Sequence, residues 1–190
     1  YKSEDKITED GESAKKFVRM LINAHHEAMI EHSTLSVMFT VDRGVSHEMV
    51  RHRIASFAQE STRYVNYSKD KYGNEINVID LAPGIALDRR MQDMPAETIE
   101  AVLNEWELAM LDAEKHYMKM IELGATAQIA RSVLPNSTKT NITITANYRE
   151  WRNYFRLRTA SDAHPQIREV SVALLNELKE RIPVIFDDIA

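Results

Sequence analysis

The chain has 190 residues, of which 44% are hydrophobic and 28% charged, the balance of one soluble globular domain spanning residues 1–190. Cysteine is absent, which excludes disulfides, thiolate metal sites and every mechanism that needs a cysteine nucleophile. The formal net charge of -5 argues against general polyanion binding, and we find neither a membrane span nor a secretory leader in the sequence, so we expect a cytoplasmic protein. Because the chain begins with Tyr1 instead of methionine, we also expect that a natural N-terminal segment is missing.

The first predicted elements are a helix and a strand. Residues 12–32 have apolar positions at helical spacing and predict an amphipathic helix; these positions are Phe17, Met20, Leu21 and Ala24. Alternating apolar residues over 35–41 predict a strand with one buried face, closed by a turn at 42–44.

A second helix is predicted to carry the tripeptide Arg51-His52-Arg53, because Ser46 is a plausible N-cap and Glu48 is favourable in the first turn. On a helical wheel with about 3.6 residues per turn, Arg53 falls among apolar neighbours, which are Met49, Val50, Ile54 and Phe57. A buried guanidinium is costly unless it is paired. Two interpretations stay open: a structural ion pair or snorkelling side chain, and an arginine that faces an anionic ligand.

The rest of the chain is predicted to be mainly helical. A loop or short strand at 63–67 and a short strand at 76–79 precede a long helix over 94–123 and a short helix over 125–134. A strand over 138–145, a helix over 147–158 and a last helix opened by Pro165 follow. Without a regular βαβ repeat, this order predicts an α+β fold: a single domain with helices packed around a small mixed or antiparallel sheet.

The helix over 147–158 is expected to carry an arginine on its apolar face. Arg158 projects into the face formed by Tyr148, Trp151, Tyr154 and Phe155. The opposite face is predicted to be polar, with Arg149, Arg152, Asn153 and Arg156. Planar bidentate donors suit phosphate, carboxylate and uracil edges, so the two arginine clusters of this acidic chain suggest small phosphorylated ligands.

The stretch from Arg51 to Tyr64, RHRIASFAQESTRY, resembles the signature of flavin-dependent thymidylate synthases, which is Arg-His-Arg, seven residues, then Ser and usually Arg-Tyr. Two further blocks stand in the expected order: IARSVLP at 129–135, and Asn-Tyr-Arg at 147–149 continuing through Asn153 to Leu-Arg at 157–158. The resemblance covers the chain from about His26 to the last helix.

The resemblance implies roles for individual side chains. Contacts to FAD are implied for Arg51, His52, Arg53, Gln59, Asn147, Tyr148, Arg149 and Asn153. Contacts to dUMP are implied for Glu48, Arg51, Gln59, Glu60, Ser61, Thr62, Arg63, Arg131 and Arg158. Within this set Ser61 and Arg63 would lie near the phosphate, and Arg158 would bind the uracil edge and favour ionisation at N3 as the catalytic residue.

The implied reaction is the reductive methylation of dUMP to dTMP. In this family methylenetetrahydrofolate gives the carbon and NADPH reduces FAD, which then serves as hydride source, so no cysteine thiolate is needed. The resemblance also implies a homotetramer with active sites at subunit interfaces. Ser61 could be read as a nucleophile, but no Asp/His partner is apparent in sequence, and we favour phosphate binding.

Three positions depart from the family pattern. Ala58-Gln59 stands where many members have Asn-Glu, so a contact that needs a carboxylate at position 59 is in doubt. Glu48 replaces an Arg or Gln, and its carboxylate would repel a phosphate, so we expect the side chain to point away. Ala28 lacks the hydroxyl that often reaches the flavin.

Two other functions fit parts of the sequence. The histidines and glutamates over 25–32 invite a metal site, but their spacing is not His-Glu-x-x-His, and we expect no metal. An arginine-rich helical module that binds nucleic acid would show a basic surface and steep salt dependence. The acidic net charge and the ordered signature both count against it, so we expect neither nucleic acid nor membrane as a partner.

Overall fold

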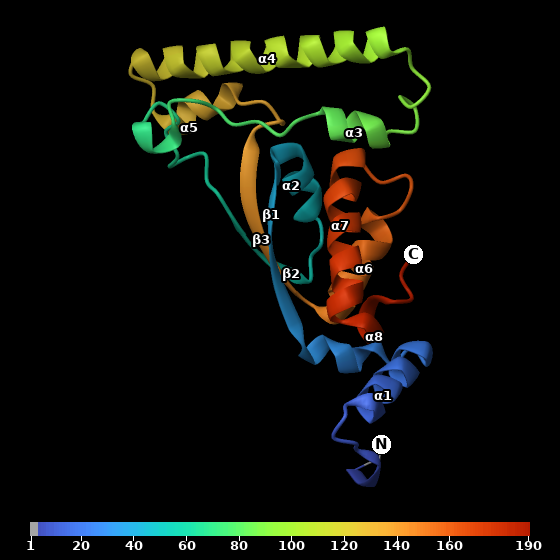
Figure 1. Cartoon of the computed structure of the whole chain (residues 1–190). Coiled ribbons are helices and arrows are strands. Elements are labelled where there is room, and N and C mark those ends of the chain that lie inside the picture. The colour runs from blue at the N-terminus through green and yellow to red at the C-terminus, as the bar shows by residue number, and fades with distance from the viewer. Residues whose placement is uncertain (1–3) are drawn as a thin grey trace. The chain divides into compact units, whose positions relative to one another are not determined.

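The computed structural model describes residues 4–190 (Figure 1). These residues form two compact units. The first unit comprises the described residues through Ser36, together with Thr145–Ala163 and Ile167–Ala190. The second unit comprises Val37–Ile144 and His164–Gln166. Each unit is described by itself below.

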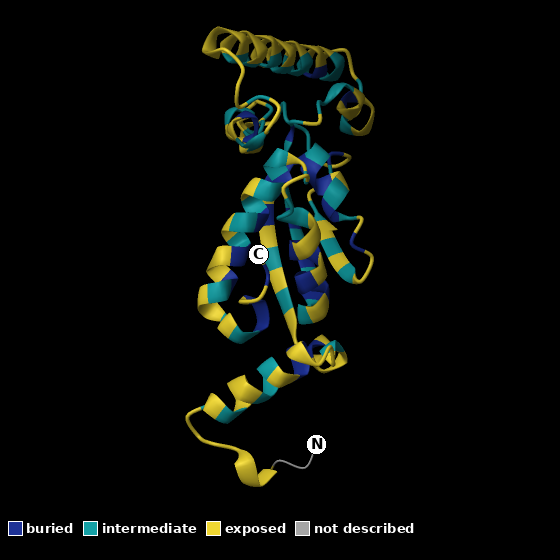
Figure 2. Cartoon of the chain, turned by 90° about the vertical axis from the view of Figure 1, so that its right-hand side faces the viewer, coloured by how far each residue is buried: buried dark blue, intermediate teal, exposed yellow. Residues whose placement is uncertain are grey.

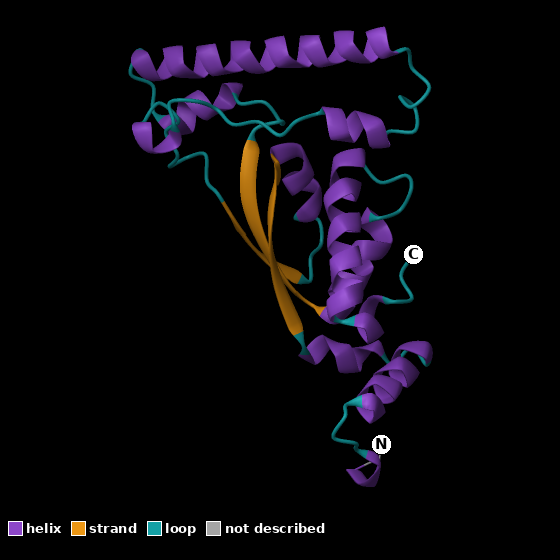
Figure 3. Cartoon of the chain, in the orientation of Figure 1, coloured by secondary structure: helices purple, strands orange, loops and turns teal. Residues whose placement is uncertain are grey.

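Three strands form one sheet in the order β1-β3-β2 (Figure 3); their bounds are β1 Thr34–Asp42, β2 Ala55–Gln59 and β3 Lys139–Asn147. Side-chain hydrogen bonds link Ser36 to Thr145 at 2.7 Å and Thr40 to Asn141 at 2.8 Å. Residue numbers rise along β1 while they fall along β3, so the two strands are antiparallel. Alternate residues of β3 are buried, as a strand with one inward face requires.

The first unit is mainly helical and contains an aromatic core. Its helices are η1 Glu4–Lys6, α1 Glu12–Asn23, η2 Glu27–His32, α6 Tyr148–Arg158, α7 Pro165–Arg181 from Ile167 onward, and α8 Pro183–Phe186. Phe155 is fully buried and lies 5.8 Å from the Trp151 ring and 5.6 Å from the Phe186 ring, centre to centre. Such offset and edge contacts add to the stability that burial of the rings provides.

The second unit contains the longest helix. Its elements beside the strands are α2 Arg43–Met49, η3 Asp70–Tyr72, α3 Ala82–Leu87, α4 Ala96–Glu122, α5 Ala127–Ala130 and η4 Arg131–Val133. Helix α4 is coloured mostly exposed or intermediate in Figure 2, and Tyr117 is its buried residue. None of the helices within residues 4–190 is long and apolar enough to cross a membrane.

Most of the sequence-based elements are confirmed. The α+β fold, the strands over 35–41 and 138–145, the long helix and the helix over 147–158 all appear. The single helix over 12–32 was wrong, because α1 ends at Asn23 and His25 takes a positive φ of 56°, which interrupts a helix. The strand at 76–79 was also wrong and is reduced to an isolated bridge between Val78 and Thr138.

The expected helix around Arg51-His52-Arg53 was wrong as well. Asp42 caps α2 by accepting a hydrogen bond from the Val45 amide at 2.6 Å, so the helix starts four residues before the expected start and ends at Met49. Ser46 lies inside α2, where its hydroxyl donates to the Arg43 carbonyl at 2.9 Å. Arg53 is therefore exposed, and the following residues form β2, which the sequence pattern did not predict.

Candidate active site

The residues that the sequence singles out fall into two groups, one in each unit. The group in the second unit consists of Glu48, Arg51, His52, Arg53, Gln59, Glu60, Ser61, Thr62, Arg63 and Arg131. The group in the first unit consists of Asn147, Tyr148, Arg149, Asn153 and Arg158.

The tripeptide lies between α2 and β2. Arg51 and Arg53 are exposed, whereas the His52 side chain between them is buried. The backbone of the tripeptide is non-helical. Two guanidinium groups are thus presented to solvent from one short segment, and both can donate to an anionic ligand.

Two side chains at the end of β2 are hydrogen-bonded inside the second unit. The Gln59 amide nitrogen donates to the hydroxyls of Ser46 at 2.8 Å and Thr140 at 3.3 Å. The Glu60 carboxylate accepts from the backbone amide of Asn141 at 3.0 Å and from its side-chain amide at 2.7 Å. These bonds fix the start of the segment 59–63 on strand β3.

The segment continues as a tight turn. The Ser61 carbonyl accepts from the amides of Tyr64 and Val65, both at 3.2 Å, and the Ser61 hydroxyl accepts from the Arg63 amide at 3.3 Å. Arg131 on η4 donates to the Thr62 hydroxyl at 3.5 Å, which brings two predicted substrate residues together. Arg63 in this turn and Arg131 on η4 are both exposed. A hydroxyl with such cations is a donor set that suits a phosphate.

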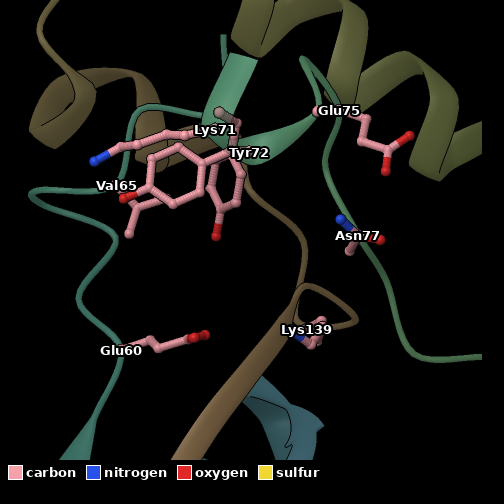
Figure 4. A pocket seen from close by; sticks show the side chains of 9 residues that line it. Glu60, Val65, Lys71, Tyr72, Glu75, Asn77 and Lys139 are labelled. Atoms are coloured by element: carbon pink, nitrogen blue, oxygen red, sulfur yellow. The ribbon is translucent and has the colours of Figure 1, made fainter. Parts of the chain in front are cut away.

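A hollow of about 350 Å³ opens beside this segment (Figure 4). Its lining residues are Glu60, Val65, Tyr67, Lys71, Tyr72, Gly73, Glu75, Asn77 and Lys139. The Lys71 ammonium lies 4.7 Å from the centre of the Tyr72 ring, and burial raises the pKa of Tyr67. Apart from Glu60, sequence reasoning missed this lining, because no periodic pattern marks residues that meet only after folding.

The group in the first unit is carried by α6 and its N-cap. Asn147 caps the helix by accepting from the Glu150 amide at 2.8 Å. Arg149 is exposed and lies 2.5 Å from Glu31, and its Nε lies 3.6 Å from Glu27. The ion pair with Glu31 raises the pKa of Arg149 further above its ordinary value, so the guanidinium is charged.

The other members of this group differ in exposure. The Asn153 side chain is exposed and donates to the Glu150 carboxylate at 3.3 Å. Tyr148 packs its ring against Phe186, with ring centres 6.0 Å apart. Arg158 is half-buried and is the last residue of α6, so the helix reaches the position on which the wheel argument depends.

Arg152 contradicts the expected polar face of α6. Its side chain is 0% exposed, donates bidentately to Asp188 at 2.6 Å for each bond, and donates also to the Ile185 carbonyl. The C-terminal segment after α7 covers it, and no local pattern along α6 could show that. The carboxylate of Glu27 lies 3.8 Å from Arg152 Nε and 3.5 Å from Arg156.

Glu27 and Glu31, near α6, therefore pair with arginines. Within residues 4–190, no group of three or more His, Cys, Asp or Glu side chains is arranged to hold a metal ion. The described site residues therefore belong to an α+β protein whose exposed guanidinium groups can donate to anionic ligands.

Comparison with known proteins makes the assignment specific. The family model described as thymidylate synthase complementing protein matches residues 1–184. The flavin-dependent thymidylate synthase of Corynebacterium aurimucosum is 32% identical over 99% of this chain and 75% of its own length. Those of Mycobacteroides abscessus and of Mycobacterium sp. strain KMS are 30% and 35% identical, over 99% and 90% of this chain and 74% and 68% of their own lengths. The chain belongs to the flavin-dependent thymidylate synthase family, which confirms the resemblance seen in the sequence and makes it an enzyme with a flavin cofactor.

Proposed function

We propose that the protein converts dUMP to dTMP by reductive methylation, with methylenetetrahydrofolate as carbon donor and NADPH-reduced FAD as hydride source. The ordered signature from Arg51 to Tyr64, within a chain that matches the family over nearly its full length, carries this proposal. The matches also favour the enzyme over the nucleic-acid-binding alternative.

The turn after β2 is proposed to bind the phosphate of dUMP. Ser61 supplies a hydroxyl, and Arg63 and Arg131 supply exposed guanidinium groups. Planar guanidinium donors match phosphate oxygens in pairs. The remaining proposed dUMP contacts are Glu48, Arg51, Gln59, Glu60 and Thr62.

The exposed donors fit a flavin dinucleotide. Arg51, Arg53 and Arg149 present charged guanidinium groups to solvent, and a diphosphate needs such donors. His52, Gln59, Asn147, Tyr148 and Asn153 complete the proposed contacts. Bound FAD would supply the redox chemistry that the chain lacks, and these side chains would bind and orient it. Because Gln59 Nε2 is already hydrogen-bonded to Ser46, Gln59 would meet a ligand through its carbonyl oxygen or after rotating.

Arg158 is proposed to lie against the uracil ring. Its half-buried position keeps a permanent positive charge partly shielded from water, where electrostatic stabilisation is stronger. The guanidinium would stabilise the negative charge that develops at N3, and it would act without forming a covalent bond.

A cytoplasmic homotetramer with active sites at subunit interfaces is proposed as the working form. Leu108 and Leu111 on α4 are 60% and 56% exposed, and apolar side chains of this size gain from burial against another chain. Light scattering at concentrations where FAD is bound tests this assembly, and a monomeric mass would contradict it.

Reconstitution with FAD tests the function most directly. Purified protein should give a flavin spectrum, and the loaded protein should form dTMP in a single turnover with dUMP, methylenetetrahydrofolate and NADPH. Failure to bind FAD in titrations at micromolar concentrations would contradict the proposal. A colourless preparation that retards DNA in a gel would favour the nucleic-acid-binding alternative instead.

A further inference from the structure

Tyr117 is the buried side chain of an otherwise exposed or half-buried helix. Along α4, all of which the structure describes, Tyr117 alone is buried, and it is 0% exposed. Tyrosine usually finds a hydrogen-bond partner for its hydroxyl when it is buried. The partners in this case lie on the loop that follows the proposed phosphate-binding turn.

The Tyr117 hydroxyl contacts the backbone of that loop twice. It accepts from the Tyr67 amide at 3.4 Å and donates to the Val65 carbonyl at 3.5 Å. Burial raises the pKa of Tyr117, so the hydroxyl stays protonated and can donate at neutral pH. The Tyr67 ring meets the Tyr117 ring edge-on, with centres 5.6 Å apart. The Tyr117 side chain therefore contacts both the backbone of the loop and the Tyr67 ring.

Val65 connects this anchor to the turn. Its amide donates to the Ser61 carbonyl at 3.2 Å, while its carbonyl accepts from Tyr117. The Ser61 hydroxyl also accepts from the Arg63 amide. The turn that carries Ser61 and Arg63 therefore ends at Val65, whose backbone is bonded to Tyr117. Val65 and Tyr67 also line the hollow beside Glu60 (Figure 4 labels Val65).

We propose that Tyr117 is a positioning residue that holds the turn at 61–65 in the geometry for binding the nucleotide phosphate. This inference rests on the proposed function. Tyr117 touches no reacting atom; it acts through Val65 and Tyr67. Its hydroxyl matters because a buried donor and acceptor left unpaired would make the ordered loop less favourable.

The substitution Tyr117→Phe isolates the hydroxyl, because the ring and its packing remain. Loss of such a hydrogen bond should raise the KM for dUMP about 3- to 10-fold. Turnover at saturating dUMP should change by less than about two-fold, since the chemical step is untouched. A purely structural role would lower the melting temperature without separating KM from kcat.

Trp106→Phe is the matched control on the same helix. The half-buried Trp106 donates from its ring nitrogen to the Ser137 hydroxyl at 3.0 Å, away from the turn. This variant also loses one hydrogen bond from α4, yet it should leave the KM for dUMP unchanged. If the wild type binds dUMP and the two variants have the same KM for dUMP, the inference is overturned while the proposed function stands. A wild-type holoenzyme that does not bind dUMP would overturn the proposed function and the inference with it.

Hydrogen–deuterium exchange of the holoenzyme gives a second measurement, and its wild-type part needs no folded variant. The Tyr67 amide should exchange slowly in the wild type, because the buried Tyr117 hydroxyl accepts from it. In Tyr117→Phe the same amide should exchange faster, while amides of β3 stay protected. Exchange in the wild type as fast as that of an exposed amide would contradict the proposed anchor.

Discussion

Arg152 and Asp188 meet through two parallel hydrogen bonds of 2.6 Å, so a fully buried guanidinium of α6 holds a carboxylate near the end of the chain. The same guanidinium also donates to the Ile185 carbonyl. This pairing ties the C-terminal segment to the helix that carries Arg149, Asn153 and Arg158. The stability of the first unit is therefore expected to depend on it.

Arg152→Ala should destabilise the protein by about 3 kcal/mol or more, because it deletes a fully buried side chain with its hydrogen bonds to Asp188 and Ile185 and leaves a void. Urea unfolding at neutral pH measures the change. Arg181→Ala is the control: Arg181 pairs with Glu177 at 2.5 Å on the exposed surface of α7. That substitution should cost less than about 1 kcal/mol. Equal losses of unfolding free energy in the two variants would show that the buried Arg152 pair stabilises the protein no more than an exposed ion pair does.

The pairing of Arg152 with Asp188 also predicts that the stability of the protein depends on pH. The hydrogen bonds from Arg152 hold the pKa of Asp188 below its ordinary value of 3.8, against a smaller opposing effect of burial. The unfolded chain therefore takes up this proton at higher pH than the folded protein does. The stabilisation is complete above about pH 4 and is lost as pH falls through the lower folded pKa. Unfolding free energies of wild type and Asp188→Asn, measured from pH 6 downward, should differ most near neutral pH and converge in strong acid.

Asn147 should show two separable effects, because it caps α6 and is proposed to contact FAD. Asn147→Ala should lose about 1 kcal/mol of stability, whereas Asn147→Ser keeps a capping oxygen and should lose only a few tenths. Both variants should bind FAD more weakly, since neither has the carboxamide. Asp42→Ala is the control, because Asp42 caps α2 and has no proposed ligand contact. Its stability should fall while its FAD affinity, measured by titration, stays the same.

Arg158→Ala should reduce single-turnover formation of dTMP by about 100- to 1,000-fold, the usual cost of losing one preorganised donor. Arg158→Lys should recover little because lysine lacks the planar fork. Reduction of the flavin by NADPH should remain nearly intact, since that half-reaction does not involve the nucleotide. Arg156→Ala is a neighbouring control on α6, exposed and 3.5 Å from Glu27. It should retain normal dTMP formation.

Ser61→Ala distinguishes phosphate binding from nucleophilic catalysis. If the hydroxyl serves the phosphate, the substitution should mainly weaken dUMP binding and leave turnover at saturating dUMP largely intact. Complete loss of dTMP formation in Ser61→Ala, together with near-normal turnover in Arg158→Ala, would overturn the assignment and revive the serine nucleophile.

Elements with strong periodicity could be predicted from sequence, and those defined by a cap or by a distant partner could not. The alternation over 138–145 reflects the buried face of β3, and the apolar spacing over 94–123 correctly predicted a helix, although Tyr117 is the only buried residue of α4. The predicted start of α2 was wrong because Ser46 was taken as its cap, whereas Asp42, which was expected in a turn, is the cap, and both residue types cap helices well. Only the hydrogen bond from Val45 to Asp42 decides it.

The candidate site was predicted through its motif and not through its physical pattern. The wheel placed Arg53 on a buried face, yet Arg53 is exposed on a non-helical segment. The same reasoning placed Arg152 in solvent, yet the segment around Asp188 buries it. A contact far along the chain decided the case of Arg152, whereas the earlier start and end of α2 decided that of Arg53. The Tyr117 anchor was missed for the same reason as the burial of Arg152, since Val65 and Tyr67 are distant from it along the chain.

The two units are interleaved along the chain, because β1 and β3 each begin in one unit and end in the other. The first unit is assembled from three separate stretches of sequence, and the second from two. A single cut in the gene would therefore yield two fragments, at least one of which contains parts of both units. Complementation between fragments would suit this arrangement better than expression of either unit alone.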